Sequence, residues 1–167
     1  MKQEELEWLM DTYGDQIVRL CYMYLKDWHL AEEATQETFI KVYKKYDNFR
    51  NESSHKTWMM TIAINTCKSY QRTAWFKKVH IGLESKEEIG SSLEEEILES
   101  IEKDDVLKAI YQLESKYKEV ILLYYYQEMT IEEIARVLQI KSGNVKMRLQ
   151  RGRKKLGEYL SEVGIYA

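Results

Sequence analysis

The chain has 167 residues without a single proline, and this absence limits the folds that it can adopt. Glycine is sparse as well, with only seven residues. Loop-rich sandwiches, collagen-like repeats and low-complexity linkers need many turns or polyproline segments, which this composition does not supply. Helices need neither residue in their interior. The sequence therefore predicts an all-α protein.

The lack of a long apolar segment, the first residues and the two cysteines narrow the class of protein further. No window approaches the roughly 18 consecutive apolar residues of a membrane span. The first residues are mostly acidic, where a secretory signal would be basic and then apolar, so we expect a cytoplasmic protein. Cys21 and Cys67 are far apart in the sequence and form no Cys-x-x-Cys pair. We interpret them as buried, reduced thiols.

Charge is distributed in blocks, although the net charge is only −3. Residues 53–83 carry five lysines and arginines and no acid, and residues 131–155 carry eight against two acids. Between them, residues 84–105 carry ten acidic and two basic side chains. This alternation favours a protein that contacts a polyanion at two places over a uniformly acidic enzyme.

The first half of the chain shows helical periodicity in three segments. Apolar residues from Leu6 to Tyr24 predict one helix, or two that meet near Gly14. Asp27 can cap a second helix over residues 28–46, and a third helix is expected over about 56–73. The polar residues 47–55 between these two helices predict a loop. Together these segments predict a first domain over residues 1–76.

The rest of the chain predicts a linker and a second helical domain. Residues 77–104 are an acidic, flexible linker by composition, with a short helix near residues 93–101. The second domain, over residues 105–167, begins with two short helices, the second of them capped by Ser115.

A helix-turn-helix is predicted within the second domain. Thr130-Ile131-Glu132-Glu133 has the spacing of a capping box, which opens a short helix. The turn at residues 139–143 joins it to a longer helix that runs from Asn144 to about Tyr159. The outward face of that helix is rich in lysine and arginine, which suits DNA binding as well as a solvated surface.

Three motifs in series resemble those of the extracytoplasmic-function sigma factors of bacterial RNA polymerase. Residues 29–39, with sequence HLAEEATQETF, resemble the motif by which the family docks on polymerase. Residues 57–65, TWMMTIAIN, are similar to the promoter-melting helix, and residues 133–153 resemble the helix-turn-helix that reads the −35 element. The resemblance covers nearly the whole chain in the family's order.

The sequence departs from the family pattern at three positions. Glu114 replaces a common Leu-Pro dipeptide, Gln139 replaces a turn glycine, and Ser69 replaces a frequent aspartate. Glutamate suits the first turn of a helix, and glutamine is tolerated provided that the turn avoids a positive φ. The substitution by Ser69 bears on which promoter details are read.

The resemblance implies roles for individual residues. Docking on a basic coiled coil of the polymerase is implied for Glu33, Gln36 and Glu37, which lie on one helix face. Recognition and melting of the −10 element are implied for Lys56, Trp58, Asn65, Lys68, Ser69 and Arg72, with Tyr70 and Trp75 as further aromatic platforms for bases. Trp58 suits the core as well as a platform. Recognition of the −35 element is implied for Ser142, Asn144, Lys146, Arg148, Gln150, Arg151 and Arg153.

The function implied by the resemblance is that of a sigma factor. Such a protein binds core RNA polymerase and double-stranded promoter DNA, recognises a bipartite promoter and helps to melt the −10 strand. It needs no catalytic residue, metal or cofactor of its own, and the family implies a membrane-associated anti-sigma factor as its regulator. We also hypothesise that the acidic segment shields the two basic blocks in the free protein.

Two other classes of protein are alternatives to a sigma factor. A stand-alone helix-turn-helix regulator predicts operator binding without polymerase and a stable homodimer. A carboxylate-bridged metal enzyme would need two Glu-x-x-His motifs, and the spacing of His29, His55 and His80 provides none. We therefore expect no enzymatic activity.

Overall fold

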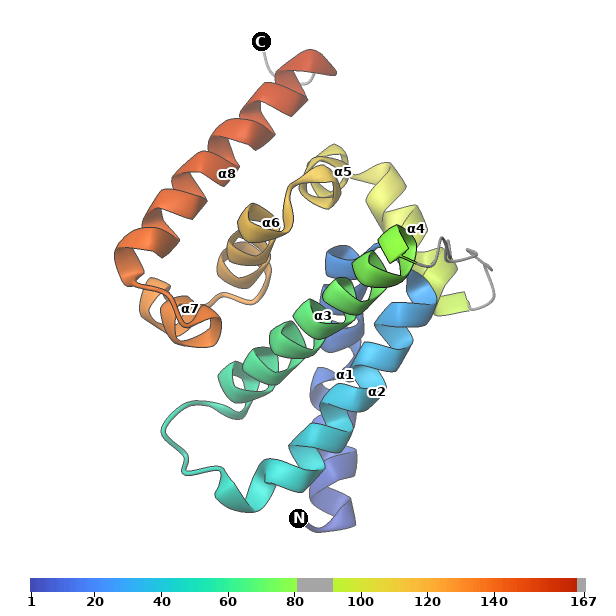
Figure 1. The fold of residues 1–167 in the computed structure, drawn as a ribbon, viewed down its shortest axis with the longest axis vertical. Helices are drawn as coiled ribbons and strands as arrows, with labels where there is room; N and C mark the ends of the chain where they lie inside the picture. The colour runs from blue at the N-terminus through green and yellow to red at the C-terminus, as the bar shows by residue number, and fades with distance from the viewer. Residues whose placement is uncertain (81–91, 165–167) are drawn as a thin grey trace. The chain divides into compact units, whose positions relative to one another are not determined.

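The structure is a computed structural model that describes residues 1–80 and 92–164 of the chain (Figure 1). These described residues form helices and contain no β-strand. They divide into two compact units, with residues 1–80 in the first and residues 92–164 in the second. The predicted all-α class, with two helical units, is confirmed.

Three helices form the first unit, and each packs against the other two (Figure 1). They are α1 (Gln3–Leu25), α2 (Trp28–Lys45) and α3 (His55–His80). Side chains with no exposed surface fill the space between them, because burying apolar area is the main force that holds such a bundle. This core includes Leu9, Ile17, Cys21, Ala31, Val42, Met59, Met60, Ile64 and Cys67.

The boundaries of these helices agree with the sequence prediction at some points and differ at others. The Asp27 carboxylate accepts a hydrogen bond from the Leu30 backbone N–H at 3.0 Å, so the predicted cap of α2 is confirmed. α1 passes Gly14 without a break. α3 runs seven residues beyond its predicted end, because no glycine or proline follows until Gly82.

The second unit contains five α-helices and a π-helical turn in its described part (Figure 1). The α-helices are α4 (Ser92–Lys103), α5 (Asp105–Gln112), α6 (Ser115–Ile121), α7 (Ile131–Leu138) and α8 (Ser142–Glu162). α8 packs against α5, α6 and α7, so it forms one long side of the unit's core. That core includes Ile110, Val120, Leu123, Ile134, Val137, Val145 and Leu149.

α4 confirms the short helix that was predicted within the acidic segment. It packs against α5 and buries Ile97 and Ile101, so this part of the segment belongs to the second unit. The middle of the predicted linker, residues 81–91, lies outside the described residues. Its flexibility therefore stays a prediction.

Two local features of the second unit differ from the sequence prediction. Ser115 is the first residue of α6, and Glu114 occupies the cap position instead. After α6, η2 (Leu122–Tyr126) is π-helical, and the Gln127 backbone N–H donates to the Leu122 carbonyl oxygen at 3.1 Å, five residues back. Such a turn does not follow the α-helical period of 3.6 residues, so helical periodicity does not predict it.

The helix-turn-helix is present, with its predicted capping box. The Glu133 N–H donates to Thr130 Oγ1 at 3.2 Å, and the Thr130 N–H donates to Glu133 Oε2 at 2.8 Å. The link to α8 is only residues 139–141, and Gln139 has φ of 55°. The condition under which glutamine was expected to cost little at this turn, the absence of a positive φ, is not met, because α7 ends on a left-handed residue.

Candidate nucleic-acid and partner interfaces

The acidic face of α2 brings together the three residues that were expected to dock on a partner. Glu33 and Gln36 are exposed, whereas Glu37 is half-buried. His29 Nε2 lies 3.1 Å from Glu33 Oε1, one turn away on the same helix. The structure thus presents two of the three side chains openly and places the third where α2 meets α3.

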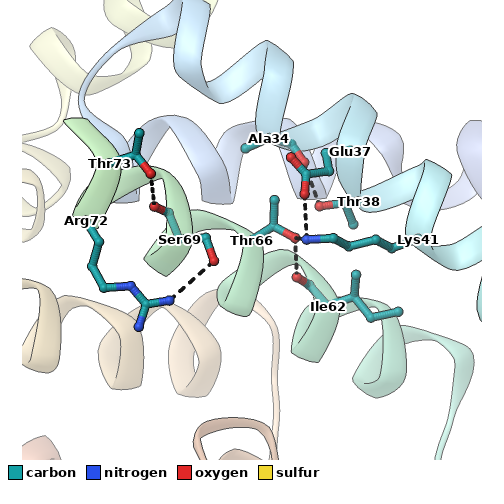
Figure 2. Close-up of polar contacts among 9 residues, drawn as sticks. All are labelled: Ala34, Glu37, Thr38, Lys41, Ile62, Thr66, Ser69, Arg72 and Thr73. Atoms are coloured by element: carbon teal, nitrogen blue, oxygen red, sulfur yellow. Dashed lines mark hydrogen bonds and ion pairs between the residues drawn. The ribbon is translucent and has the colours of Figure 1, made fainter. Parts of the chain in front are cut away.

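Glu37 belongs to a polar network that joins α2 to α3 (Figure 2). Its Oε1 lies 2.7 Å from Lys41 Nζ, and Lys41 Nζ donates to Thr66 Oγ1 on α3 at 3.2 Å. The Tyr70 hydroxyl, one turn further along α3, also hydrogen bonds to Glu37. Neither Lys41 nor Thr66 was singled out from the sequence as a binding residue, although the Glu37–Lys41 spacing of four is a recognisable signal.

The network shifts the pKa values of two of its residues. The hydrogen bond from Lys41 holds the pKa of Glu37 below its ordinary value, against the opposing effect of burial. Burial, followed by the hydrogen bond to Glu37, raises the pKa of Tyr70 to about 12. Tyr70 was expected as an aromatic platform, but its hydroxyl is engaged on α2.

The exposed face of α3 carries three of the residues expected to contact the −10 element. Asn65, Ser69 and Arg72 are spaced by four and three residues and are all exposed. Arg72 Nη2 lies 3.4 Å from Ser69 Oγ, so these two side chains meet on that face (Figure 2). Lys56 and Lys68 are half-buried.

Trp58 lies in an aromatic cluster at the loop before α3. Its ring centroid is 4.8 Å from that of Phe49 and 6.3 Å from that of Tyr46, in the 3₁₀ turn η1 (Tyr46–Asn48). His55 lies 4.9 Å from Phe49 in the same cluster. Trp58 is therefore packed at the edge of the unit, while Trp75 is 62% exposed near the end of α3. The 3₁₀ turn breaks the helical period, so periodicity does not predict this cluster.

α8 presents most of the residues expected at the −35 element on its exposed surface. Five are exposed and Ser142 is half-buried, while Val145 and Leu149 face the core. Gly152 lets α8 approach α6 closely, because a Cβ at this position would lie 3.3 Å from Ile121 Cγ1. The exposed residues are Asn144, Lys146, Gln150, Arg151 and Arg153.

Two arginines of α8 are engaged by their own unit. Arg148 Nη1 donates to Glu119 Oε1 at 3.1 Å, and Glu119 on α6 has only 3% of its side chain exposed. Arg153 Nε donates to the Tyr125 hydroxyl at 2.6 Å, and its guanidinium lies 5.6 Å from the ring centre of Tyr124. Glu119 was not among the residues expected from the sequence, although an acid between the core residues Tyr117 and Val120 is a usable signal.

The part of the chain that the structure describes also bears on other classes of site. Among these residues, no group of three His, Cys, Asp or Glu side chains could hold a metal ion. Cys21 and Cys67 are free and buried, and their hydrogen bond together with burial raises the pKa of the Cys67 thiol. No helix in residues 1–80 or 92–164 is long and apolar enough to span a bilayer.

Known families and curated proteins resemble the chain over most of its length. The model of sigma-70 region 2 matches residues 9–77, and that of sigma-70 region 4 matches residues 103–156. The ECF RNA polymerase sigma factor SigW of Bacillus subtilis (strain 168) is 32% identical over 165 residues, which cover 93% of this chain and 88% of SigW. SigM of the same organism is 30% identical over 152 residues, which cover 89% and 90%.

Solved structures share the fold. The sigma factor RpoE from Bartonella quintana, solved with the anti-sigma factor NepR, matches with a TM-score of 0.76 and 22% identity, over 95% of this chain and 98% of that one. CnrH, solved with the cytosolic domain of CnrY, matches with a TM-score of 0.70 and 19% identity, over 96% and 90%.

Proposed function

The chain belongs to the extracytoplasmic-function (ECF) sigma factors of bacterial RNA polymerase, and from this premise we propose how its residues divide the work. It binds core RNA polymerase and promoter DNA and directs promoter-specific transcription initiation. The observation that carries this conclusion is the similarity to SigW over 93% of the chain. Sigma factors are not enzymes, so we assign the synthesis of RNA to the polymerase alone.

The first unit docks on polymerase through the exposed acidic face of α2. Glu33 and Gln36 can accept hydrogen bonds there and attract a basic partner surface. Glu37 lies beside them on the same helix and adds its charge to this face, with Lys41 as its partner one turn away. The expected target is the basic coiled coil of the polymerase, as the family implies.

The same unit reads the −10 element through α3. The Asn65 amide can donate to one base atom and accept from another, and Ser69 and Arg72 continue its face. Lys56 and Lys68 neutralise nearby phosphates, which is a contribution that weakens with salt. Stacking on an aromatic ring stabilises a displaced base by roughly 1–3 kcal/mol. Trp58, at the edge of the unit, and the exposed Trp75 can provide it.

The second unit reads the −35 element through α8. Ser142, Asn144, Lys146 and Gln150 lie in the first half of the helix, which enters the major groove in this motif. Arg151 and Arg153 lie further along, and we assign them to the phosphate backbone. Arg148, with its guanidinium on Glu119, holds α8 against α6 and supports the reading face.

A protein inhibitor is a further part of the proposal. RpoE and CnrH, which share the fold, were each solved with a partner, the anti-sigma factor NepR and the cytosolic domain of CnrY. We expect this chain to be held in the cytoplasm by a membrane-associated anti-sigma factor of comparable role. A stand-alone regulator is the less favoured alternative, because it does not account for sigma-70 region 2 at residues 9–77.

In vitro transcription tests the proposed function. The chain, core polymerase and a pool of genomic promoter fragments are combined, and run-off transcripts are compared with those obtained when the chain or the core is left out. We expect specific transcripts only when both are present. Glu33→Lys should weaken core binding, whereas Asp11→Lys, a matched reversal on α1, should not. Specific DNA retention by the chain alone, with no transcript on adding core, would favour the stand-alone regulator.

A further inference from the structure

Three consecutive tyrosines occupy the end of the π-helical turn η2, and the proposed function gives them no role. Tyr125 and Tyr126 are 50% and 46% exposed, and Tyr124 is half-buried. Among the described residues, Arg153 of α8 contacts the first two of these tyrosines and not the third. π-Helical turns are often found at functional sites. The contact of this turn with α8 is therefore a candidate for a functional role.

Tyr124, Tyr125 and Arg153 form a cluster that we call the tyrosine–arginine corner. The two rings meet edge to face, with centroids 4.9 Å apart and planes at 78°. The guanidinium lies 5.6 Å from the centre of the Tyr124 ring and 5.5 Å from that of the Tyr125 ring, within the range of cation–π attraction. Its Nε also donates to the Tyr125 hydroxyl oxygen at 2.6 Å. Residues of a single turn thus hold the guanidinium through two rings and one hydrogen bond.

The hydrogen bond at Nε leaves the main phosphate-binding groups of the arginine available. A guanidinium has five N–H donors, and the Tyr125 hydroxyl occupies the single one on Nε. The other four are on Nη1 and Nη2, and two of them can bind one phosphate in parallel. An arginine side chain that is already fixed loses less conformational freedom when DNA binds. The corner is therefore suited to present a preformed phosphate donor.

Arg153 lies on the same face of α8 as residues assigned to the −35 element. Lys146, Gln150 and Arg153 are spaced by four and three positions, and all three are exposed. Arg153 is about two turns beyond Lys146, towards the end of the helix that leaves the groove. The tyrosine–arginine corner therefore fixes a positive charge where the phosphate backbone borders the reading face.

We propose that Tyr125 is a positioning residue for the −35 contact, with the Tyr124 ring as its support. Its hydroxyl holds the Nε of Arg153, so that the Nη edge of the guanidinium points to a backbone phosphate. Tyr125 acts through Arg153 and makes no DNA contact of its own. The inference rests on the proposed function, because it takes Arg153 as a contact to the phosphate backbone.

A double-mutant cycle on promoter affinity tests the inference. Holoenzyme is assembled from core polymerase and saturating full-length chain, and the probe is a promoter fragment that yields a specific run-off transcript. The dissociation constant of this fragment is measured for wild type, Tyr125→Phe, Arg153→Ala and the double variant. Tyr126→Phe is the matched control, because it removes the same hydroxyl from the next residue, which is similarly exposed.

The loss caused by Tyr125→Phe should depend on Arg153. We expect Arg153→Ala to weaken promoter binding about fivefold or more, and Tyr125→Phe to weaken it about threefold. The double variant should bind within about 1.5-fold of Arg153→Ala, because Tyr125 has nothing to position once the guanidinium is absent. A purely structural effect of Tyr125→Phe would persist in that background. Tyr126→Phe should stay within about 1.5-fold of wild type.

Three results would overturn the inference. They are unchanged promoter binding by Tyr125→Phe, a further loss of the same size when Tyr125→Phe is added to Arg153→Ala, and an equal loss in Tyr126→Phe. Unchanged binding by Arg153→Ala would remove its assigned phosphate contact and the inference with it. Failure of the wild-type holoenzyme to give any specific transcript would instead count against the proposed function.

Discussion

At the scale of single residues, the turn of the helix-turn-helix contains a side chain in an unfavourable backbone conformation. Gln139 adopts φ of 55° at the end of α7, a region where a Cβ is crowded by the following carbonyl. Its N–H still closes the helix, because it donates to the Arg136 carbonyl oxygen at 3.4 Å. Gln139 thus adopts the backbone conformation that the turn requires, and this conformation is locally strained.

Replacing Gln139 by glycine should relieve that strain. We expect Gln139→Gly to raise the free energy of unfolding of the second unit by about 1 kcal/mol, because glycine adopts positive φ without a steric penalty. Urea denaturation of the full chain, followed by circular dichroism, measures the change. Lys154→Gly, inside α8, is the control and should lower the free energy by about 1 kcal/mol. A loss of stability in Gln139→Gly would contradict the prediction.

Replacing Arg148 or Arg151 by alanine should have different effects on stability and on DNA binding. Arg148→Ala removes a charged hydrogen bond to a buried carboxylate, which should cost about 2 kcal/mol of unfolding free energy. Arg151→Ala removes an exposed side chain and should change stability by less than about 0.5 kcal/mol, while weakening DNA binding. Calorimetry and a DNA titration of the two variants test this. Equal stabilities of the two variants would show that the ion pair between Arg148 and Glu119 does not stabilise the fold.

Because of Tyr70, the stability of the first unit should depend on pH in the alkaline range. Its pKa is raised to about 12 in the folded state from an ordinary value near 10, so the folded state holds the proton more tightly than the unfolded state. Its contribution to stability is complete below pH ~10 and is lost as the pH rises toward ~12. The wild-type chain should therefore lose more stability over this interval than Tyr70→Phe. Parallel curves would contradict the raised pKa.

At the scale of elements, two glycines of α8 should respond oppositely to enlargement. Gly152 faces Ile121 on α6 with room for barely a methyl group, whereas nothing lies within 4 Å of a Cβ at Gly157. Gly152→Val should destabilise the protein by about 2 kcal/mol through overpacking. Gly157→Ala should stabilise it by about 1 kcal/mol through helix propensity. Thermal unfolding of both variants checks the contrast, which would fail if Gly152→Val were neutral.

The elements that local sequence determines were predicted well. The Asp27 cap and the Thr130 capping box depend on residues three positions apart, and both are present. The end of α3, the π-helical turn η2 and the cap before α6 were not predicted. In these cases packing against other helices, or a hydrogen-bonding period other than the α-helical one, decides the outcome.

The same distinction, between features that local sequence decides and features that helix packing decides, applies to the candidate sites. Helical periodicity alone puts Asn65, Ser69 and Arg72 on one face of α3, and the structure shows that these three residues are exposed. Spacing could not reveal that Arg148 meets Glu119, 29 positions away, or that Lys41 meets Thr66, 25 positions away. Such contacts depend on how helices pack against each other, which a single sequence does not specify.

At the scale of the whole molecule, charge in the acidic segment is predicted to affect DNA binding. Glu95, Glu96 and Glu102 are exposed on α4. Changing all three to glutamine should strengthen DNA binding by the free chain several-fold at low salt, and the gain should shrink as salt screens the charges. Removing the segment as far as residue 100 would be a poorer test, because it would also remove the buried Ile97.

A control of equal charge separates local shielding from net charge. Changing Glu4, Glu7 and Asp11, which are exposed on α1, to the corresponding amides alters the net charge by the same amount. We expect a smaller gain in DNA affinity from this triple change. Equal gains from both triple variants, or no gain from the α4 variant, would rule out shielding by the acidic segment.

All four tryptophans of the chain, Trp8, Trp28, Trp58 and Trp75, lie in the first unit. The second unit contains tyrosines but no indole. Emission excited near the red edge of the absorption band, where indole absorbs almost alone, therefore originates in the half of the molecule assigned to docking and melting. The intact chain carries its own optical label, and the two halves can be followed separately through unfolding or assembly without an attached dye.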